Sequence, residues 1–517
     1  MHKYLLSFFI VAFISISGFS QRLENYKPLI SKGKIPKEFI ELSSKKYLIE
    51  EKAIDKNETP SRKALKKKFL LESNFHIDDI LSSGTVLFND SLTNYINGVA
   101  DYLLKDQQEL RDQLQFYTIK STEVNAFATD KGIIFVTLGL LSQIQSEAQL
   151  AWILSHEIIH YKYKHNIETY IESQKILKGE KEYKKTSKNV RLSAIYKYSH
   201  ENESDADVKG LEEIYSKSDY SFEDVKNTFD VMLYSYLPIE EFDFNKSFFE
   251  SENLKFPASY SPVNPKPIIA IEGYDDSKST HPNIKKRREA INNTIDKLNH
   301  PDGKSFSAFS KDYFFNIRQI ARFELCNTFL SDRDYEDAIF NAYSIMKKDS
   351  FSNEYLESVI GKGLYGLSKY KNSNEFNATH LKVKDIEGSK YNLVYFFEEI
   401  TKKELNILAL TYLFNHNIKF TKSTGLQNQE DDLLKDLVYV NKLFPDSFYI
   451  RNDISNSKLN QDTLTEAQLS KLDKYERIKY KRKKQITENP NSSNYAFALT
   501  NQLKDTRFAL QFEKYKK

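Results

Sequence analysis

Apolar positions follow different patterns along the first third of the chain. From Asp90 to Leu104 they recur at helical spacing, which predicts an amphipathic helix. Leu114–Lys120 and the β-branched run Gly132–Thr137 are short apolar segments that predict two strands, the second of them buried. Leu138–Ile144 predicts a short turn or helix. Ala148–Ile159 is apolar almost all round, which predicts a helix inside a core.

The first candidate functional residues are polar side chains inside this core helix. Ser146 with Gln149 predicts a capping box that starts the helix. His156 and His160, four residues apart, project from the same side, so that both imidazoles can reach one zinc ion at about 2.0–2.1 Å. Glu157 points obliquely toward the same place and can hold a metal-bound water rather than the metal. The alternative is a pair of core histidines with ordinary hydrogen-bond partners.

A third ligand is predicted from a second helical stripe. Its members fall on one face at helical spacing: Leu192, Ile195, Tyr196, Ser199, Glu203, Asp207, Leu211 and Ile214. Carboxylates on an apolar face are costly unless a cation faces them. Glu203 is therefore the predicted ligand, and Asp207 the predicted acceptor of a hydrogen bond from a ligand histidine, which fixes its tautomer. Asp205 and its neighbours on the other side are predicted to be solvated. The alternative is an ordinary acidic helix in which Glu203 and Asp207 fall on the apolar face by chance.

The composition limits the residue types that can form a functional site. The 517 residues carry a net charge of +3, which gives no electrostatic case for binding nucleic acid. Cys326 is the single cysteine, so a disulfide framework and a cysteine-based zinc module are both excluded. Any metal site must use histidines and carboxylates.

The first twenty residues predict export. A basic start at His2-Lys3 precedes an apolar stretch and a small-x-small site at Gly18-Phe19-Ser20. The prediction is a signal peptide over residues 1–20 and a mature protein without a transmembrane segment in the bacterial periplasm. The alternatives are secretion or anchoring by an uncleaved signal. Residues 21–80 are predicted to be helical and polar, and the basic patch at residues 62–68 is predicted to be a solvated face.

Several motifs together carry a family resemblance. They are Asn125-Ala126-Phe127, the run from Gly132 to Thr137 with Gly139-Leu140-Leu141, Glu147, His156-Glu157-x-x-His160 with His165, and Glu203-x-x-Ala206-Asp207. This combination closely resembles the HtpX-like and CAAX-prenyl-endopeptidase family of zinc metallopeptidases, peptidase family M48. The resemblance covers roughly residues 85–295. The polar insertion at about 166–190 departs from it and leaves the loop over the site unpredicted.

The resemblance implies roles for individual residues. His156, His160 and Glu203 match the zinc ligands, which agrees with the stripe argument. His281-Pro282 with Arg287 resembles a His-Pro and Arg element whose histidine lies near the zinc in some members. The resemblance therefore implies a role at the site for His281, either a catalytic one in stabilising the transition state or occupation of the open coordination position, whereas the residues alone indicate a loop histidine. The residues expected around the ligands are Asp207, His165, Arg287 and Asn125. Five other histidines are isolated and are predicted to be surface or core residues: His76, His200, His300, His380 and His416.

Beyond residue 300 the sequence becomes helical. Phe323–Leu330 and Tyr335–Tyr343 resemble a helix pair of the tetratricopeptide type, with Ala338 where close packing needs a small residue. The pattern does not recur cleanly at the expected period, so a peptide-docking scaffold and a generic helical packing domain both stay open. The basic run Lys474–Lys484 is interleaved with Glu476 and tyrosines, which favours a solvated helix over a nucleic-acid patch.

The predicted fold is α+β and mostly α. It consists of a signal peptide (1–20), an N-terminal helical segment (21–80), a gluzincin-type zinc metallopeptidase domain (81–300) with a small sheet and an active-site helix, and a helical domain (301–517) of tetratricopeptide-like character. The predicted function is an exported endopeptidase with one Zn²⁺ per chain and Glu157 as general base, acting on envelope proteins in quality control, outer-membrane proteins among them. The alternative is an envelope assembly factor or chaperone with a latent zinc site.

Overall fold

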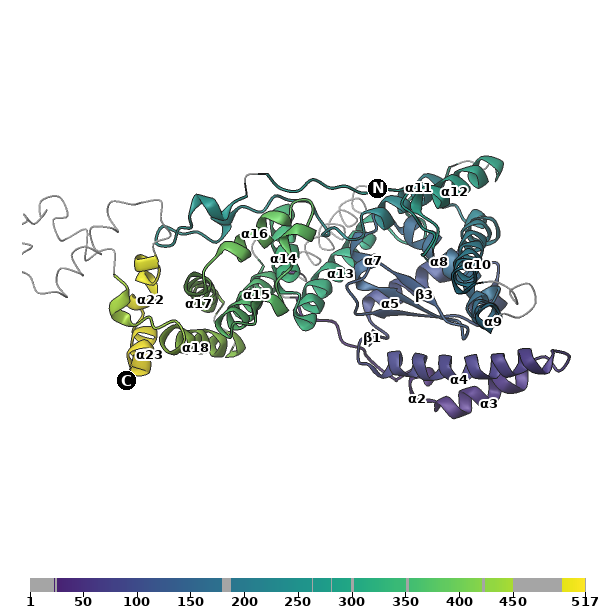
Figure 1. Cartoon of the computed structure of the whole chain (residues 1–517), viewed down its shortest axis with the longest axis horizontal. Helices are drawn as coiled ribbons and strands as arrows, with labels where there is room; N and C mark the ends of the chain where they lie inside the picture. The colour runs from purple at the N-terminus through teal and green to yellow at the C-terminus, as the bar shows by residue number, and fades with distance from the viewer. Residues whose placement is uncertain are drawn as a thin grey trace, which may run out of the picture. The chain divides into compact units, whose positions relative to one another are not determined.

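The computed structural model places most of the chain, and the elements are drawn in Figure 1. It describes residues 23, 26–178, 187–262, 264–279, 281–298, 302–349, 353–420, 424–449 and 495–516. The predicted signal peptide, His300 and the basic run Lys474–Lys484 lie outside these residues. Contacts divide the chain into two compact units. We call residues 27–239 with 269–328 the site unit, and residues 240–268 with 329–517 the helical unit, to which the N-terminal residues up to Tyr26 also belong.

The N-terminal segment of the site unit is helical, as predicted. Its helices are α2 (Lys37–Ile40), α3 (Ser43–Ala53) and α4 (Pro60–Ser82). Helix α4 begins at Thr59, whose side chain accepts a hydrogen bond from the backbone of Arg62. Its residues Ile77 and Leu81 are buried against the sheet residues Val86, Tyr117, Ile133 and Phe135. In the predicted basic patch Lys66 and Lys67 form ion pairs with Glu58 and Glu51, as suits a solvated helix face.

A four-stranded sheet lies at the centre of the site unit. Its strands are β1 (Val86–Leu87), β2 (Gln115–Ile119), β3 (Ala126–Ala128) and β4 (Ile133–Thr137), in the order β1-β2-β4-β3. Strand β4 pairs with β2 in parallel and with β3 in an antiparallel manner. From the sequence, the Gly132–Thr137 strand just upstream of the core helix could either offer its edge to an extended peptide or be an ordinary sheet strand. It is the second, because β4 is interior, and the strand at the end of the sheet beside β4 is β3.

The turn between β3 and β4 depends on Gly132. Its φ is +78°, which favours glycine, and a Cβ there would lie 2.2 Å from the carbonyl oxygen of Gln113. The chain then passes through β4 into α7 (Leu138–Gln143) and α8 (Glu147–Lys162). The predicted strands and the predicted core helix are confirmed.

Helix α8 is buried along nearly its whole length, from Glu147 to Ile159. Ser146 caps it by accepting a hydrogen bond from the backbone of Gln149. The predicted capping box is only half formed, because the Gln149 side chain accepts from the backbone of Gln145 instead of Ser146. The Glu147 carboxylate accepts hydrogen bonds from the hydroxyls of Tyr95 and Tyr220, among other donors, and so anchors the start of the helix.

Among the described residues, six helical segments pack against α8. They are α5 (Ser91–Leu103), α9 (His165–Lys178), α10 (Lys188–Lys209), the π-helical turn η2 (Gly210–Ile214), η3 (Tyr215–Lys217) and α11 (Phe222–Leu233). The other helices described in this part of the chain are α6 (Gln108–Arg111), α12 (Ile284–Leu298) and α13 (Lys311–Asp332). The polar insertion at 166–190 forms most of α9 and the start of α10, which pack against each other. A Cβ at Gly210 would lie 3.1 Å from the backbone nitrogen of His156, so this glycine lets the end of α10 approach α8 closely.

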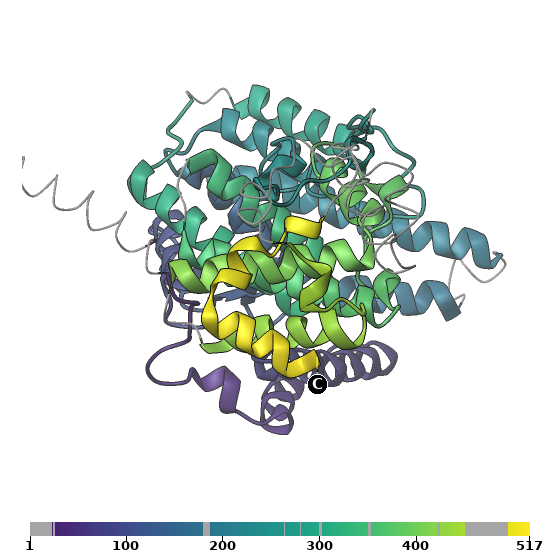
Figure 2. The same cartoon turned by 90° about the vertical axis from the view of Figure 1, so that its left-hand side faces the viewer.

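The helical unit is a series of packed helices. They are α14 (Tyr335–Asp349), α15 (Glu354–Asn372), α16 (Tyr391–Glu399), α17 (Lys402–Lys419), α18 (Thr424–Tyr439), α22 (Thr500–Lys504) and α23 (Thr506–Lys516). Helix α14 packs on α15, α15 on α17, and α17 on α18. The yellow C-terminal helix α23 lies beside the green helices in Figure 2 and contacts α18. The helical prediction is confirmed, and the tetratricopeptide type stays a prediction.

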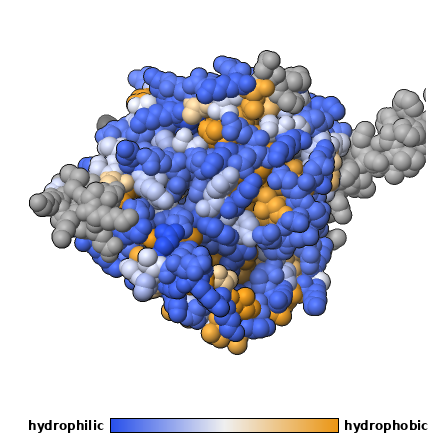
Figure 3. All heavy atoms as spheres, turned by 90° about the vertical axis from the view of Figure 1, so that its right-hand side faces the viewer, coloured by the Kyte–Doolittle hydropathy of each residue, from blue (hydrophilic) through white to orange (hydrophobic). Residues whose placement is uncertain are grey.

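The surface agrees with the composition. The face drawn in Figure 3 is mostly hydrophilic, with apolar atoms in small separate groups. Within the described residues, no helix combines the length and the hydropathy needed to cross a membrane. Cys326 is a buried free thiol.

Candidate metal centre

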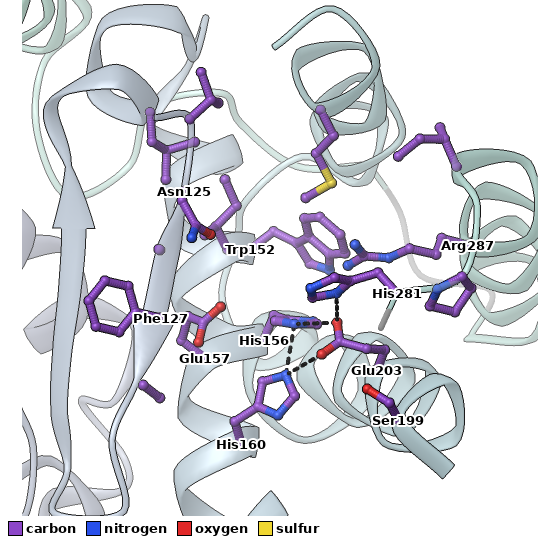
Figure 4. Close-up of a pocket in the computed structure, with 18 of the residues that line it drawn as sticks. Asn125, Phe127, Trp152, His156, Glu157, His160, Ser199, Glu203, His281 and Arg287 are labelled. Carbon is purple, nitrogen blue, oxygen red and sulfur yellow. Dashed lines mark hydrogen bonds and ion pairs between the residues drawn. The ribbon is translucent and has the colours of Figure 1, made fainter. Parts of the chain in front are cut away.

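Helix α8 brings its two histidines together as the spacing predicts. The Nε2 atoms of His156 and His160 lie 3.0 Å apart, one helical turn separating the residues. Figure 4 shows both rings pointing from α8 into the same pocket. Two imidazole nitrogens at this distance can share one cation.

Helix α10 supplies the carboxylate opposite them. Glu203 Oε2 lies 3.6 Å from His156 Nε2, and Glu203 Oε1 lies 3.5 Å from His160 Nε2. Tetrahedral zinc with bonds of about 2.0–2.1 Å sets its ligand atoms roughly 3.3–3.4 Å apart. The three separations are close to this value, and among the described residues these three form a group that could hold a metal ion. The donor set therefore fits a divalent cation with one coordination position left open.

Asp207 holds the first histidine in place. Its Oδ1 lies 2.9 Å from His156 Nδ1, so Nε2 faces the candidate metal position. Arg287 of α12 donates two hydrogen bonds to the same carboxylate, Nε to Oδ2 at 2.8 Å and Nη2 to Oδ1 at 2.7 Å. Burial acts to raise the pKa of Asp207, but the Arg287 guanidinium outweighs it and holds that pKa below its usual value. The carboxylate stays charged inside the core.

His165 orients the second histidine. Its Nδ1 lies 3.1 Å from His160 Nδ1, and its Nε2 lies 3.3 Å from Asp205 Oδ2. Lys209 pairs with the same Asp205 oxygen at 2.7 Å. Asp205 was predicted to be solvated; its side chain is 35 % exposed, and it is partly covered because α9 packs against that side of α10.

Burial is the largest cause of two pKa shifts at the site. It raises the pKa of Glu157 to about 7, within reach of a proton acceptor at neutral pH. Burial, together with the neighbouring His156, lowers the pKa of His160 to about 3, which keeps the imidazole neutral as a metal ligand must be. In Figure 4 Glu157 lies on the strand side of His156, and Glu203 lies on the opposite side.

The site opens into a pocket of about 510 Å³. One wall is β3 with Asn125, Ala126, Phe127 and Ala128, and the floor carries His156, Glu157 and His160. Trp152, one turn before His156 on α8, and Ser199, one turn before Glu203 on α10, also line it. The predicted neighbour Asn125 therefore lies at the pocket wall rather than against the candidate ligands.

His281 reaches the pocket from a loop before α12. Its Nδ1 lies 2.9 Å from Glu203 Oε2, while the side chain remains 57 % exposed (Figure 4). His200 Nε2 of α10 lies 2.8 Å from the carbonyl oxygen of Ser279 and so ties this loop to the helix that carries Glu203. The structure thus places His281 at the site, at its open side.

Sequence reasoning missed three supporting residues. His200 was interpreted as an isolated histidine, Asp205 as solvated, and Gly210 was not considered. A glycine inside a helical pattern is a signal for close packing, so Gly210 could have been singled out. The contacts of His200 and Asp205 depend on segments far apart in the sequence, for which no local signal exists.

A His-Glu-x-x-His helix beside a small sheet, with a carboxylate from a following helix, is the arrangement typical of gluzincin-type metallopeptidases. Comparison with known families agrees with this arrangement. Residues 90–295 match the model of Peptidase family M48.

Curated relatives match part of this chain. The chain is 28 % identical over 102 residues to the Beta-barrel assembly-enhancing protease of Yersinia pestis, which is 20 % of this chain and 21 % of the relative. It is 28 % identical over 91 residues to the Beta-barrel assembly-enhancing protease of Escherichia coli, 18 % of this chain and 19 % of the relative. The matched region thus spans about a fifth of the length of these relatives.

Proposed function

We propose that this protein is a zinc-dependent endopeptidase. The observation that supports it most is the convergence of His156, His160 and Glu203, whose ligand atoms all lie within 4.8 Å of one another, beside a buried Glu157 in an accessible pocket. Two imidazoles and one carboxylate with an open position form a donor set typical of catalytic rather than structural zinc. One Zn²⁺ per chain is proposed.

Each residue has a task in hydrolysis. Bound zinc would acidify a water molecule and polarise the carbonyl of the peptide bond. Glu157 accepts the proton of the attacking water and returns it to the leaving amine. His281, at the open side of the pocket, donates a hydrogen bond to the oxygen that becomes negative. Asp207 with Arg287, and His165 with Asp205, keep the two imidazoles in orientation.

The substrate backbone binds along β3. This strand pairs with β4 on one side, and no strand among the described residues pairs with its other side. Because Ala126, Phe127 and Ala128 also line the pocket, a peptide added to this edge would pass over His156 and Glu157. Edge pairing uses main-chain hydrogen bonds, so it fits an endopeptidase that acts on extended or unfolded segments.

The substrates are proposed to be proteins of the bacterial envelope. The export prediction for residues 1–20 and the names of the relatives, which refer to β-barrel assembly, support a periplasmic role in the quality control of outer-membrane proteins.

The experiment that tests the function is metal analysis and casein turnover of residues 21–517, with and without a chelator. We expect about one zinc per chain and turnover that the chelator abolishes. Glu203→Gln should lower metal affinity by more than about 100-fold. Glu201→Gln, on the exposed side of the same helix, is the matched control and should change neither. Full turnover in metal-free protein would refute the proposal.

A further inference from the structure

Hydrogen bonds between β3 and β4 show which main-chain groups of β3 face its free edge. The carbonyl oxygen of Asn125 accepts a hydrogen bond at 3.1 Å from the backbone nitrogen of Thr137, at the end of β4. The main-chain groups of successive residues in a strand point to opposite sides. Those of Ala126 and Ala128 therefore point away from β4, toward the side on which no strand among the described residues pairs.

The two alanines differ in what lies against their main chain. Asn166 of α9 donates a hydrogen bond from Nδ2 to the carbonyl oxygen of Ala128 at 3.0 Å. Burial raises the pKa of Glu157, and the backbone N–H of Ala128 acts in the opposite direction, so this N–H faces the Glu157 carboxylate. The described residues supply no hydrogen-bond partner for the main chain of Ala126. An extended peptide at this edge therefore finds an open donor and acceptor at Ala126.

A substrate residue paired with Ala126 directs its side chain toward α8. Residues directly opposite each other in neighbouring strands have their side chains on the same face of the sheet. Phe127 packs on the face that is covered by Ile77 and Leu81 of α4. Because side chains alternate along a strand, Ala126 faces the other way, toward the pocket and α8.

The spacing along β3 and α8 places this substrate side chain near Trp152. Ala128 faces Glu157, and Ala126 lies two strand residues, about 6.6 Å, farther along. On α8, Ile153 lies one turn, about 6 Å, before Glu157. Figure 4 shows that the two directions agree, since Asn125 and Trp152 lie at one end of the pocket and His160 and Ser199 at the other. The substrate side chain therefore lies within two residues of the scissile bond.

The Trp152 end of the pocket is apolar, and we call it the apolar subsite. It is lined by Leu140, Trp152, Ile153, Met232 and Ile284. Trp152 is held by an edge contact with Phe229, with ring centroids 5.2 Å apart. Arg287 also lines the pocket, but its guanidinium is paired with Asp207. An apolar side chain gains free energy by leaving water for such a surface, whereas a charged one loses hydration without gaining a partner.

We propose that the apolar subsite makes the enzyme selective for a large apolar substrate side chain (leucine, methionine or phenylalanine) at one fixed position within two residues of the scissile bond. The substrate residue pairs with Ala126 through its main chain and packs on Trp152 and Met232. This inference rests on the proposed peptidase function and names the chemistry of its substrate. Large apolar residues are buried in folded proteins, so the selectivity directs cleavage to unfolded segments.

The selectivity is measured by cleaving denatured casein and identifying the cleaved bonds by mass spectrometry. We expect large apolar residues to be enriched about tenfold over charged ones at the selected position. Met232→Lys places a cation in the subsite, at the partly exposed end of α11. It should shift the preference toward glutamate. The measure is the ratio of kcat/KM for two peptides that differ only there, leucine against glutamate, and it should fall at least about tenfold.

Two further variants complete the test. Asn227→Lys adds the same charge at an exposed position of α11 that does not line the pocket, and it should leave the ratio unchanged. Met232→Ala covers failure of the lysine variant to fold, judged by circular dichroism. It should lower kcat/KM for the leucine peptide about five- to tenfold and leave that for the glutamate peptide unchanged.

The outcomes separate this inference from the function on which it rests. A parent that cleaves without preference at any position near the bond would overturn the inference and leave the peptidase function standing. An unchanged ratio in a folded Met232 variant would do the same. A parent without any cleavage that a chelator abolishes would refute the proposed function, and this inference with it.

Discussion

Different interactions predominate around the candidate ligands and in the helical unit. In the site unit the candidate ligands are oriented by charged and polar neighbours, with Asp207 against His156 and His165 against His160. In the helical unit aromatic rings pack around Phe396, with the ring centroids of Phe244 and Phe256 at 6.0 and 5.1 Å from its own. Directional polar contacts fix geometry, whereas apolar burial supplies stability. Substitutions in the first unit should therefore affect chemistry, and those in the second should affect folding.

The largest expected effect is a loss of turnover without a loss of metal binding or stability. Glu157→Gln removes the proton acceptor but keeps the size and burial of the side chain. We expect casein turnover to fall about 10³-fold or more. Bound zinc, measured by elemental analysis, and the unfolding temperature should stay near those of the parent. Retained turnover by the purified variant would contradict the mechanism.

The counterpart in the helical unit is Phe340→Ala. Phe340 on α14 is fully buried, so its loss leaves a cavity and should destabilise the helical unit by about 3–5 kcal/mol. The measurement is denaturant unfolding followed by circular dichroism. Zinc content should not change under native conditions. A loss of zinc from the folded variant would contradict the expectation that substitutions in the helical unit leave the metal site unaffected.

A smaller effect is expected from Asp207→Asn. The amide cannot balance the buried Arg287 or orient His156 as the carboxylate does, so metal affinity should fall about 10–100-fold. Competition with a chromogenic chelator measures this. Asp275→Asn, at an exposed turn of the same unit, is the control. Unchanged affinity would mean that the Asp207 contact does not position the ligand.

The smallest effect concerns helix packing. A Cβ at Gly363 of α15 would lie 2.7 Å from the Ile339 side chain of α14, so Gly363→Ala should destabilise the helical unit by about 1–2 kcal/mol. Gly425→Ala is the matched control, because nothing lies within 4 Å of its added Cβ. It should be neutral or slightly stabilising, since alanine favours helices. Equal unfolding midpoints for the two variants would contradict close packing of α14 on α15.

Local periodicity determined much of the site. The buried helix around His156 and His160 follows from an apolar run with a fixed i, i+4 spacing, and the phase of the next stripe places Glu203 and Asp207 on one face. Such patterns are read within one segment, because a helix relates residues three or four apart in the same way wherever it occurs.

Only the tertiary structure decided which segments meet. It placed β3 rather than β4 at the end of the sheet, brought Asp205 to His165, and tied His200 to the loop of His281. It also placed residues 240–268 in the helical unit, although their neighbours in the sequence belong to the site unit. The contacts of Asp205 with His165 and of His200 with Ser279 join residues 40 and 79 positions apart, and they depend on how whole helices pack. Sequence periodicity fixes the face that a helix buries, but the partner on that face is chosen by the packing of the complete core.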